Sequence, residues 1–370
     1  KPFYKTLIVK KVAQFWATFS FLTPSKCSGG PILAPTSEET MKAAITAIGG
    51  YVPEYVLTND ELATMVDTND EWITTRTGIK ERRILKPEEG MGASYLAIKA
   101  VEAMKEEYGV TVDDVDLVIL ASVTPDMPVA ITSAYIAQEI GATNAYAFDL
   151  QAACSSFLYA VSNAAAYIES GKYKKVLVVG SDVMSSIVDY TDRTTCILFG
   201  DGCGVALMEP NEEGLGVQDE ILRTDASGRD FLRIEAGGSF LPPSHETIDN
   251  KQHAIRQEGQ SVFRFAVSRM ADTSAELLEK NGLTGEDVAY LVPHQANLRI
   301  IDATARRMEL TKEKVVVNIQ KYGNTTSATI PLGMWDYRDK FKKGDNIFFA
   351  AFGGGFTWGA MWVKWAIDKK

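Results

Sequence analysis

Cysteine and histidine are scarce in this sequence. The 370 residues include four cysteines and three histidines, namely Cys27, Cys154, Cys196, Cys203, His245, His253 and His294. So few cysteines in a chain of this length do not form a disulfide framework, and their spacing with the histidines is not typical of a zinc site. We therefore expect a protein of a reducing compartment without a structural metal.

Long apolar runs and an excess of positive charge are also absent. No apolar stretch approaches the ~18 residues of a transmembrane helix, so we expect no membrane span. The 38 basic and 48 acidic residues give a formal net charge of -10, which disfavours general nucleic-acid binding. With 46% hydrophobic residues the chain can build an ample core. Its length suggests two domains or two packed halves of a cytoplasmic protein.

The first forty residues differ in character from the rest. They are locally basic, do not begin with methionine, and contain KKVAQFWATFSFL, which faintly imitates a secretory signal. From Met41 onward the sequence is typical of a cytoplasmic enzyme, so Met41 is a plausible start. We expect residues 1–40 to form an appendage outside the fold, followed by an N-terminal half at 41–212 and a C-terminal half at 213–370.

Strand-like and helix-like runs alternate after Met41. DLVILASV and KKVLVVGSDV are short continuous apolar runs, as expected for strands that helices cover on both faces. MGASYLAIKAVEAMKEEYG places Leu96, Ala100, Val101 and Met104 on one helical face. This alternation predicts an α/β protein.

Two parts of the chain resemble each other. GVTVDDVDLVILASVTPD resembles GLTGEDVAYLVPHQAN, YAFDLQAACSS resembles VVVNIQKYGNTT, GKYKKVLVVGS resembles FKKGDNIFFAAFG, and LFGDGCGVALM resembles AFGGGFTWGAMWV. The pairs come in the same order, which suggests two copies of one α/β unit whose equivalent loops meet across a pseudo-twofold axis. Cys154, His294 and Asn324 fall on corresponding strand ends. We expect these three side chains to converge.

A thiol, an imidazole and an amide at one edge of a sheet suit acyl transfer. Cys154 lies at the start of a predicted helix, whose dipole and free N–H groups should favour the thiolate, a good acyl acceptor. His294 and Asn324 can donate N–H groups to a thioester carbonyl or to an enolate. The glycine turn in AFGGGFTWG lets backbone N–H groups approach a substrate oxygen. Each feature alone is common in ordinary packing and turns, but together they predict acyl transfer followed by carbon–carbon bond formation.

Six motifs then point to a family. DTNDEWITTRTGIKER, YAFDLQAACSSFLYA, YTDRTTCILFGDG, LVPHQANLRI, KYGNTTSATIP and AFGGGFTWG occur in this order. From Met41 to Trp365 the sequence resembles β-ketoacyl-[acyl-carrier-protein] synthase III, the condensing enzyme that starts bacterial fatty-acid synthesis. The resemblance implies the thiolase fold, an α/β fold of five layers (α/β/α/β/α) built from two similar halves.

The resemblance implies a role for each residue of the catalytic centre. Cys154 resembles the nucleophile that accepts the acyl group. His294 and Asn324 resemble the pair that binds the malonyl thioester carbonyl and drives decarboxylation. The backbone amides of Cys154 and Gly354 resemble the oxyanion hole. The other cysteines of the predicted fold, Cys196 and Cys203, are expected to be structural.

Residues outside the catalytic centre are implied as well. They are Trp72, Arg76 and Arg193 for coenzyme A, Arg264, Arg299 and Arg306 for docking of the carrier protein, Phe157 and Leu198 for the acyl tunnel, and Val129 for the gate of the primer pocket. The indole can stack on adenine, and the guanidinium groups can bind phosphate. Arg299 and Arg306 share a helix face. In the dimer that the resemblance implies, Val129 would reach in from the partner subunit. It is smaller than the phenylalanine of acetyl-selective members, so we expect branched primers to be accepted.

The expected reaction has two stages. An acyl group passes from acyl-CoA to Cys154 and is then condensed with malonyl-acyl carrier protein, releasing carbon dioxide and giving a β-ketoacyl carrier protein. Decarboxylation supplies the carbanion, so no metal or organic cofactor is expected. The resemblance also implies a homodimer with acyl carrier protein as its partner, and neither nucleic acid nor membrane as a partner.

Three alternatives stay open on the sequence alone. A papain-like cysteine hydrolase has the same order of cysteine, histidine and asparagine, although its tryptophan-flanked cysteine signature is absent. A related thiolase-fold enzyme, such as a hydroxymethylglutaryl-CoA synthase or a secondary-metabolite ketosynthase, uses the same three side chains. A non-catalytic acyl-CoA-binding or redox-sensing protein could use Cys154 without turnover.

Overall fold

The computed structural model describes residues 41–86 and 91–368. The expected appendage at residues 1–40, which includes Cys27, lies outside the described residues. In the described ranges the strands form two larger sheets and two short two-stranded ones. None of the helices in these ranges is both long and apolar enough to cross a membrane.

The first sheet has the strand order β1-β7-β6-β4-β5. Its strands are β1 (Lys42–Tyr51), β7 (Gly202–Asn211), β6 (Val176–Asp182), β4 (Leu117–Ala121) and β5 (Tyr146–Leu150). β4 pairs in parallel with β5 and β6, whereas β7 is antiparallel to β6 and β1. Every residue of β4 and β6 is buried, as their continuous apolar runs predict.

The second sheet repeats this pattern with the order β11-β12-β13-β8. Its strands are β11 (Tyr290–Pro293), β12 (Asn346–Gly353), β13 (Thr357–Lys364) and β8 (Gly216–Thr224). β11 is parallel to β12, and β13 is antiparallel to β12 and β8. A parallel bridge between Leu291 and Val315 marks the place of a fifth strand. The expected boundary at 212/213 falls in the turn between β7 and β8, and the division of the chain there stays our proposal.

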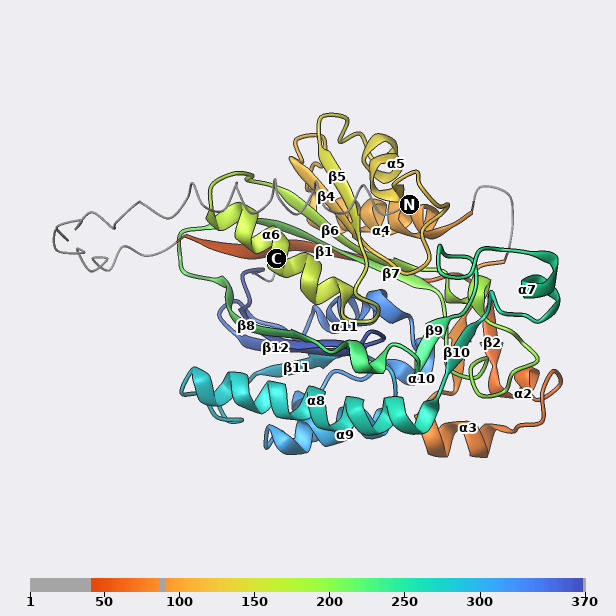
Figure 1. Ribbon diagram of the computed structural model, residues 1–370. Helices are drawn as coiled ribbons and strands as arrows, with labels where there is room; N and C mark the ends of the chain where they lie inside the picture. The colour runs from red at the N-terminus through yellow and green to blue at the C-terminus, as the bar shows by residue number, and fades with distance from the viewer. Residues whose placement is uncertain (1–40, 87–90, 369–370) are drawn as a thin grey trace, which may run out of the picture. The chain divides into compact units, whose positions relative to one another are not determined.

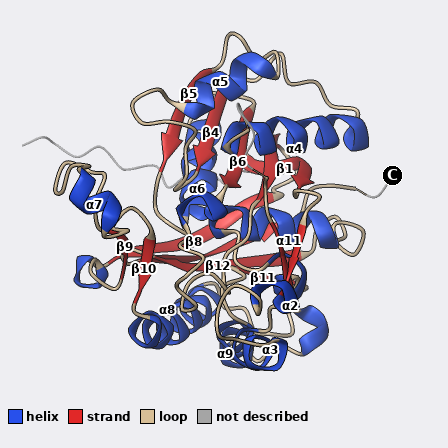
Figure 2. Cartoon of the chain, turned by 90° about the vertical axis from the view of Figure 1, so that its right-hand side faces the viewer, coloured by secondary structure: helices blue, strands red, loops and turns tan. Residues whose placement is uncertain are grey.

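Helices cover and separate the two sheets to give five layers (Figure 1). From top to bottom the helices are α4 (Ala93–Tyr108) and α5 (Thr132–Glu139) on the first sheet, α6 (Ser156–Glu169) and α11 (Thr329–Tyr337) between the sheets, and α8 (Gly259–Lys280) and α9 (Leu298–Arg307) under the second sheet. Figure 2 shows the same stacking from the side. The expected α/β class and the five-layered arrangement are confirmed.

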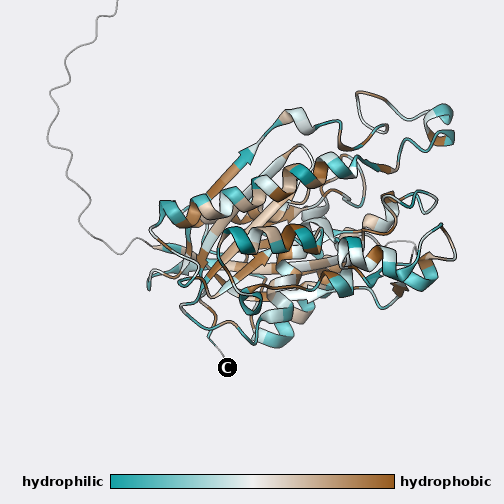
Figure 3. Cartoon of the chain, turned by 90° about the horizontal axis from the view of Figure 1, so that it is seen from below, coloured by the Kyte–Doolittle hydropathy of each residue, from teal (hydrophilic) through white to brown (hydrophobic). Residues whose placement is uncertain are grey.

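The middle layer holds a large hydrophobic core. Phe157 on α6, Met334 on α11 and Phe349 on β12 are fully buried in one cluster. Figure 3 looks at α8 and α9 from below and shows hydrophilic residues along these outer helices, with hydrophobic strands behind them.

One expectation about the acyl tunnel is wrong. Phe157 lines neither cavity of the site described below, because its ring faces the core between the sheets.

α4 shows how the sequence pattern determines an element. Its apolar positions Leu96, Ala100, Val101 and Met104 are all buried, as the helical spacing predicts. The helix ends at Gly109, whose φ of 65° gives the left-handed C-terminal cap that glycine adopts most easily.

Shorter elements connect the layers. They are β2 (Val56–Thr58), α2 (Asn59–Leu62), α3 (Asp70–Thr77), β3 (Glu81–Arg83), β9 (Leu232–Ile234), α7 (His245–Asp249), β10 (Ile255–Gln257), α10 (Ile319–Tyr322) and the 3-10 helices η1 (Met184–Ile187), η2 (Ala226–Gly228), η3 (Lys312–Lys314) and η4 (Thr326–Ala328). β2 pairs with β3, and β9 with β10. α3, β9, β10 and η4 contribute residues to the cavities of the site.

Candidate active site

Cys154 lies in a sharp turn between β5 and α6. The strand ends at Leu150, the helix begins at Ser156, and Ala153 between them has a left-handed φ of 50°. Gly353 packs against this turn so closely that a Cβ there would lie 2.5 Å from the backbone nitrogen of Cys154. A glycine is therefore required at this position. The cysteine itself is only 7% exposed.

Burial determines the protonation state of Cys154. Removal from water is the largest cause that raises the pKa of its thiol to about 12. The carboxylate of Asp182 also raises the pKa, whereas the backbone N–H of Cys154 and the hydroxyl of Thr326 lower it. The thiolate is therefore not favoured, contrary to the expectation from the start of α6, because removal from water outweighs the backbone N–H and the Thr326 hydroxyl. The residue is a free thiol.

His294 follows β11 and is held from two sides. Its backbone N–H donates to the carbonyl of Ala350 at 2.7 Å, and its Nδ1 lies 2.7 Å from Oγ1 of Thr329. The residue is 2% exposed, and burial lowers the pKa of its imidazole to about 3. The ring is therefore neutral at physiological pH, and it can exchange hydrogen bonds without bringing a charge into the site.

Asn324 lies between α10 and η4 with its side chain in a fixed orientation. Its backbone N–H donates to the carbonyl of Leu198 at 2.8 Å, and its carbonyl accepts from Gly200 at 3.1 Å. Oδ1 accepts a hydrogen bond from the backbone N–H of Thr326 at 2.9 Å. Because Oδ1 is engaged in this way, the Nδ2 group is the one that faces the cavity as a donor.

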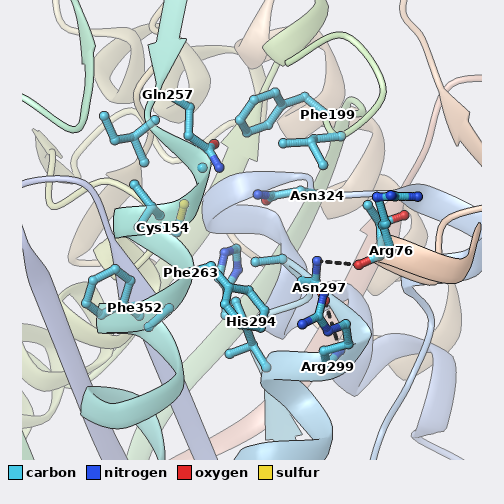
Figure 4. Close-up of a pocket in the computed structure, with 18 of the residues that line it drawn as sticks. Arg76, Cys154, Phe199, Gln257, Phe263, His294, Asn297, Arg299, Asn324 and Phe352 are labelled. Atoms are coloured by element: carbon cyan, nitrogen blue, oxygen red, sulfur yellow. Dashed lines mark hydrogen bonds between the residues drawn. The ribbon is translucent and has the colours of Figure 1, made fainter. Parts of the chain in front are cut away.

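The structure brings the three predicted catalytic side chains together. Cys154, His294 and Asn324 line one cavity of about 520 Å³ and point into it (Figure 4). A second cavity of about 390 Å³ is lined by Cys154 and by Gly354. Cys154 and Phe199 border both cavities. The thiol thus lies where the two cavities meet, and the role of the Gly354 amide as an oxyanion donor stays a prediction.

A buried carboxylate holds the loops behind the thiol. Oδ1 of Asp182 accepts from the hydroxyls of Ser122 and Thr124 at 3.0 and 2.8 Å. Oδ2 accepts from the backbone N–H of Ser327 at 3.1 Å and from its hydroxyl. Burial raises the pKa of Asp182 despite these donors. Asp182 was not among the predicted site residues, although a carboxylate that ends the apolar run KKVLVVGSD was a signal for it.

The residues expected to bind coenzyme A gather at the mouth of the larger cavity. Cζ of Arg76 lies 4.4 Å from the centre of the Trp72 ring system, and Cζ of Arg193 lies 5.2 Å from it. Trp72 and Arg76 line the cavity, whereas Arg193 contacts Trp72 from outside and donates to the carbonyl of Asp67 at 2.8 Å. Asn297, which the sequence analysis missed, donates to the backbone carbonyl of Arg76 at 2.9 Å (Figure 4).

The arginines expected to dock the carrier protein are exposed on α8 and α9, which pack side by side. Arg264 lies on α8, and Arg299 and Arg306 lie two turns apart on α9. Arg299 also lines the larger cavity, with Cζ 4.6 Å from the ring centre of Phe263. Arg299 is therefore exposed on the surface and also lines the larger cavity. Arg264 and Arg306 are exposed on the surface and do not line this cavity.

Two expectations about the acyl pocket fare differently. Leu198 lines the larger cavity, as expected. Its neighbour Phe199 borders both cavities and was not predicted, although it lies in the motif LFGDG. Val129 lines neither cavity. It lies on the loop between β4 and α5, is 103% exposed and has a φ of 75°. Val129 therefore does not gate the site of its own chain.

The remaining described cysteines fit a structural role. Cys196 and Cys203 are buried free thiols that line neither cavity. Burial raises the pKa of Cys196 to about 11 and also raises that of Cys203. Within residues 41–86 and 91–368, no group of three or more histidine, cysteine or acidic side chains is arranged to hold a metal ion.

Comparison with known proteins gives a consistent result. Residues 148–226 match the family 3-oxoacyl-[acyl-carrier-protein (ACP)] synthase III. Residues 278–365 match the family 3-oxoacyl-[acyl-carrier-protein (ACP)] synthase III C terminal. The chain is 57% identical over 332 residues to beta-ketoacyl-[acyl-carrier-protein] synthase III 2 of Bacteroides thetaiotaomicron, over 90% of this chain and 99% of that protein. It is 54% identical to beta-ketoacyl-[acyl-carrier-protein] synthase III of Phocaeicola vulgatus, over 89% and 98% of the two chains. The crystal structure of 3-oxoacyl-[acyl-carrier-protein] synthase III from Aquifex aeolicus VF5 is similar with a TM-score of 0.80 and 41% identity, over 87% of this chain and 100% of that one.

Proposed function

The chain belongs to the β-ketoacyl-[acyl-carrier-protein] synthase III family, and from this premise we propose that Cys154 accepts the acyl primer. The protein is a thiolase-fold acyltransferase that catalyses the initiating condensation of fatty-acid synthesis. The observation that carries the proposal for the site is the single cavity that Cys154, His294 and Asn324 line together.

In the first stage Cys154 exchanges a proton for an acyl group. Its sulfur attacks the thioester carbonyl of acyl-CoA, the bond to the CoA sulfur breaks, and CoA leaves with the proton. Because the pKa of the thiol is raised to about 12, the proton has to leave as the attack proceeds. The neutral imidazole of His294 in the same cavity can relay this proton. The backbone amides of Cys154 and Gly354 are the proposed donors to the oxyanion.

In the second stage His294 and Asn324 bind the malonyl thioester. Nε2–H of the histidine and Nδ2–H of the asparagine hold its carbonyl oxygen. Loss of carbon dioxide places negative charge on that oxygen as an enolate, which these fixed neutral donors stabilise. The enolate carbon attacks the acyl carbonyl on Cys154, and the bond between that carbonyl and the sulfur breaks. The thiolate that leaves takes up a proton from water, and this restores the thiol. Decarboxylation supplies the carbanion, so the proposed reaction uses no metal or organic cofactor.

Two surfaces at the cavity are proposed to bind the rest of the substrates. The indole of Trp72 with the guanidinium groups of Arg76 and Arg193 offers an adenine-stacking face and phosphate donors of the kind that the nucleotide of CoA requires. Arg264, Arg299 and Arg306 form the proposed docking strip for acyl carrier protein. Because both proposed substrates belong to fatty-acid synthesis, we propose that the reaction takes place in the cytoplasm.

We infer a homodimer formed along β5. Among the strands that the structure describes, β5 pairs with β4 alone, so its outer edge is open to another strand. Apolar side chains are exposed near it, at Met127 (57%), Val129 (103%), Tyr135 (50%) and Tyr146 (55%). A second copy that pairs there would cover this apolar surface. It would also carry the Val129 loop toward its partner, which is the arrangement that the proposed primer gate requires.

One experiment tests the proposed reaction. The protein is incubated with labelled acyl-CoA and malonyl-acyl carrier protein, and the products are separated. A labelled β-ketoacyl carrier protein is expected, together with a labelled Cys154 when malonyl carrier protein is withheld. Cys154→Ser is expected to give neither. A free labelled acid instead would indicate a hydrolase, and a bound acyl-CoA without turnover would indicate a binding protein.

A further inference from the structure

Thr326 carries a buried hydroxyl that has no hydrogen-bond partner among the described residues. The residue is 2% exposed and lines the smaller cavity with Cys154. Its Oγ1 makes no hydrogen bond of normal geometry to any group in residues 41–86 and 91–368. Buried hydroxyls are nearly always satisfied, so this one is expected to meet a partner that forms during function. The sulfur of Cys154 is the reacting atom of that cavity.

The backbone of Thr326 is linked directly to Asn324 and, through Thr329, to His294. Its N–H donates to Oδ1 of Asn324 at 2.9 Å. Its carbonyl accepts from Oγ1 of Thr329 at 3.0 Å, and that hydroxyl lies 2.7 Å from Nδ1 of His294. The main chain of Thr326 is thus connected to both donors of the larger cavity, and only its side chain is free to act on the thiol.

The repeated turn explains the backbone conformation of Thr326 but not the choice of threonine as the side chain. Thr326 has a φ of 54°, and Ala153, the residue before Cys154, has a φ of 50°. Each lies three residues before the first residue of a middle-layer helix, Thr329 in α11 and Ser156 in α6, so the two turns are equivalent in the two halves. A β-branched residue is an outlier at positive φ, where glycine or asparagine costs less. The turn therefore does not explain why threonine occupies this position.

We propose that Thr326 is a further catalytic residue, whose hydroxyl donates a hydrogen bond to the sulfur of Cys154 whenever negative charge develops there. The sulfur carries charge twice, when the thiol loses its proton to attack acyl-CoA and when the enolate displaces it from the acyl group. A donor in the same cavity as the sulfur can turn toward it and stabilise both of these charged states. This inference rests on the proposed role of Cys154 as the nucleophile.

The surroundings of Cys154 disfavour negative charge on its sulfur, so a hydrogen-bond donor is needed there. Burial and the carboxylate of Asp182 both oppose ionisation of Cys154, and the hydroxyl of Thr326 is the side chain that lowers the pKa of the thiol. Decarboxylation takes place on the malonyl carbonyl, which the donors of the larger cavity hold, and Thr326 does not line that cavity. Loss of the hydroxyl should therefore slow acyl transfer but spare decarboxylation.

Two substitutions separate the hydroxyl from the shape of the side chain. Thr326→Val removes the hydroxyl and keeps the branched shape, whereas Thr326→Ser keeps the hydroxyl. In single-turnover acylation with labelled acyl-CoA, we expect the valine variant to be about 10- to 100-fold slower, the range for losing a hydrogen bond to a charged group. The serine variant is expected to lose no more than about threefold. Alkylation of Cys154 by iodoacetamide should shift to higher pH in the valine variant only.

The decisive control is decarboxylation of malonyl-acyl carrier protein without primer, which the valine variant should carry out at nearly the wild-type rate. Equal loss of acylation and decarboxylation, or equal loss in the serine and valine variants, would overturn the proposal. If Thr326→Val does not fold, Thr326→Ala gives the same comparison with less strain at positive φ. Wild-type protein that takes no label at Cys154 would contradict the proposed function, whereas labelling at wild-type rate in Thr326→Val would contradict only this inference.

Discussion

Nδ1 of His294 lies 2.7 Å from Oγ1 of Thr329, and the same hydroxyl is 3.0 Å from the carbonyl of Thr326. A hydroxyl has one hydrogen, so Thr329 donates to only one of these two acceptors at a time. When it donates to Nδ1, the hydrogen of the neutral imidazole resides on Nε2 and can be given to the malonyl carbonyl. When it donates to the carbonyl, Nε2 is an acceptor. The tautomer of the catalytic imidazole is therefore coupled to which of the two acceptors Thr329 donates to.

Thr329→Val should impair the second stage of the reaction more than the first. Without a donor to Nδ1, the imidazole loses the hydrogen bond that favours Nε2–H, and we expect decarboxylation of malonyl-acyl carrier protein to fall about tenfold, the effect of one hydrogen bond. Acylation of Cys154 should remain measurable. Thr329→Ser is the matched control and should retain most of the activity. Nitrogen NMR of the His294 ring should show the altered tautomer, and unchanged ring signals would contradict this role.

His294 should remain neutral at pH values where ordinary histidines are protonated. Burial lowers the pKa of its imidazole to about 3, below the unfolded value near 6.5. Its contribution to stability is therefore present above pH 6.5 and is lost as the pH falls from 6.5 toward 3. In an NMR titration we expect the His294 ring to stay unprotonated down to about pH 4. The unfolding free energy relative to His294→Gln should fall by about 1.4 kcal/mol per pH unit within this window. A ring that titrates near pH 6.5 would refute the burial argument.

The convergence of the catalytic residues could be predicted because it follows from the repeat. Cys154, His294 and Asn324 stand at corresponding ends of equivalent segments, and two packed copies of one α/β unit bring such ends together. The buried strands were predictable for a similar reason, since β4 and β6 are continuous apolar runs. Local pattern and repetition were sufficient for these features.

Properties that depend on several distant segments could not be predicted. The thiol of Cys154 looked activated from its place before a helix, but its pKa depends on burial and on Asp182, which lies on another strand. Phe157 had the apolar character of a tunnel residue, yet α6 directs it into the core. Side-chain direction and hydration are set by tertiary packing, which composition and spacing do not specify.

Asp182 should be important for the stability of the site. Its carboxylate accepts hydrogen bonds from Ser122 and Thr124 on one side and from Ser327 on the other, and all of these groups are buried. Asp182→Ala leaves these donors without a partner, so we expect a loss of roughly 3 kcal/mol or more in unfolding free energy, measured by denaturant titration. The exposed Asp113 is a suitable control, since its substitution by alanine should change stability by less than about 0.5 kcal/mol. Similar stability of the two variants would contradict a structural role.

Arg306 should distinguish carrier docking from binding of CoA. It is exposed on α9 and lines neither cavity. Arg306→Glu is expected to raise KM for malonyl-acyl carrier protein severalfold, less at high salt, with little effect on acylation by acyl-CoA. Arg299→Glu should affect both substrates, because Arg299 also lines the larger cavity. Arg307, whose Nε lies 3.4 Å from Oδ1 of Asp272, is the charge-matched control on the same helix. An equal rise in KM for Arg306→Glu and Arg307→Glu would mean that only net charge matters.

Val129 should control primer choice across the proposed dimer. Since it lines neither cavity of its own chain, a gating effect requires a second copy. With valine at the gate, isobutyryl-CoA should compete well with acetyl-CoA at equal concentration. Val129→Phe should shift the preference toward acetyl-CoA by about tenfold or more, because each methylene excluded from such a pocket is worth roughly 1–3 kcal/mol.

Two controls decide whether the gate acts from the partner. Ile131→Phe places the same ring on the same loop and should leave the preference nearly unchanged. Tyr146→Lys puts a charge on the open edge of β5, where we expect it to yield monomers in light-scattering measurements. In that background Val129→Phe should no longer alter the choice between acetyl-CoA and isobutyryl-CoA. If the phenylalanine still shifts the preference in a proven monomer, or has no effect in the dimer, Val129 is not the gate.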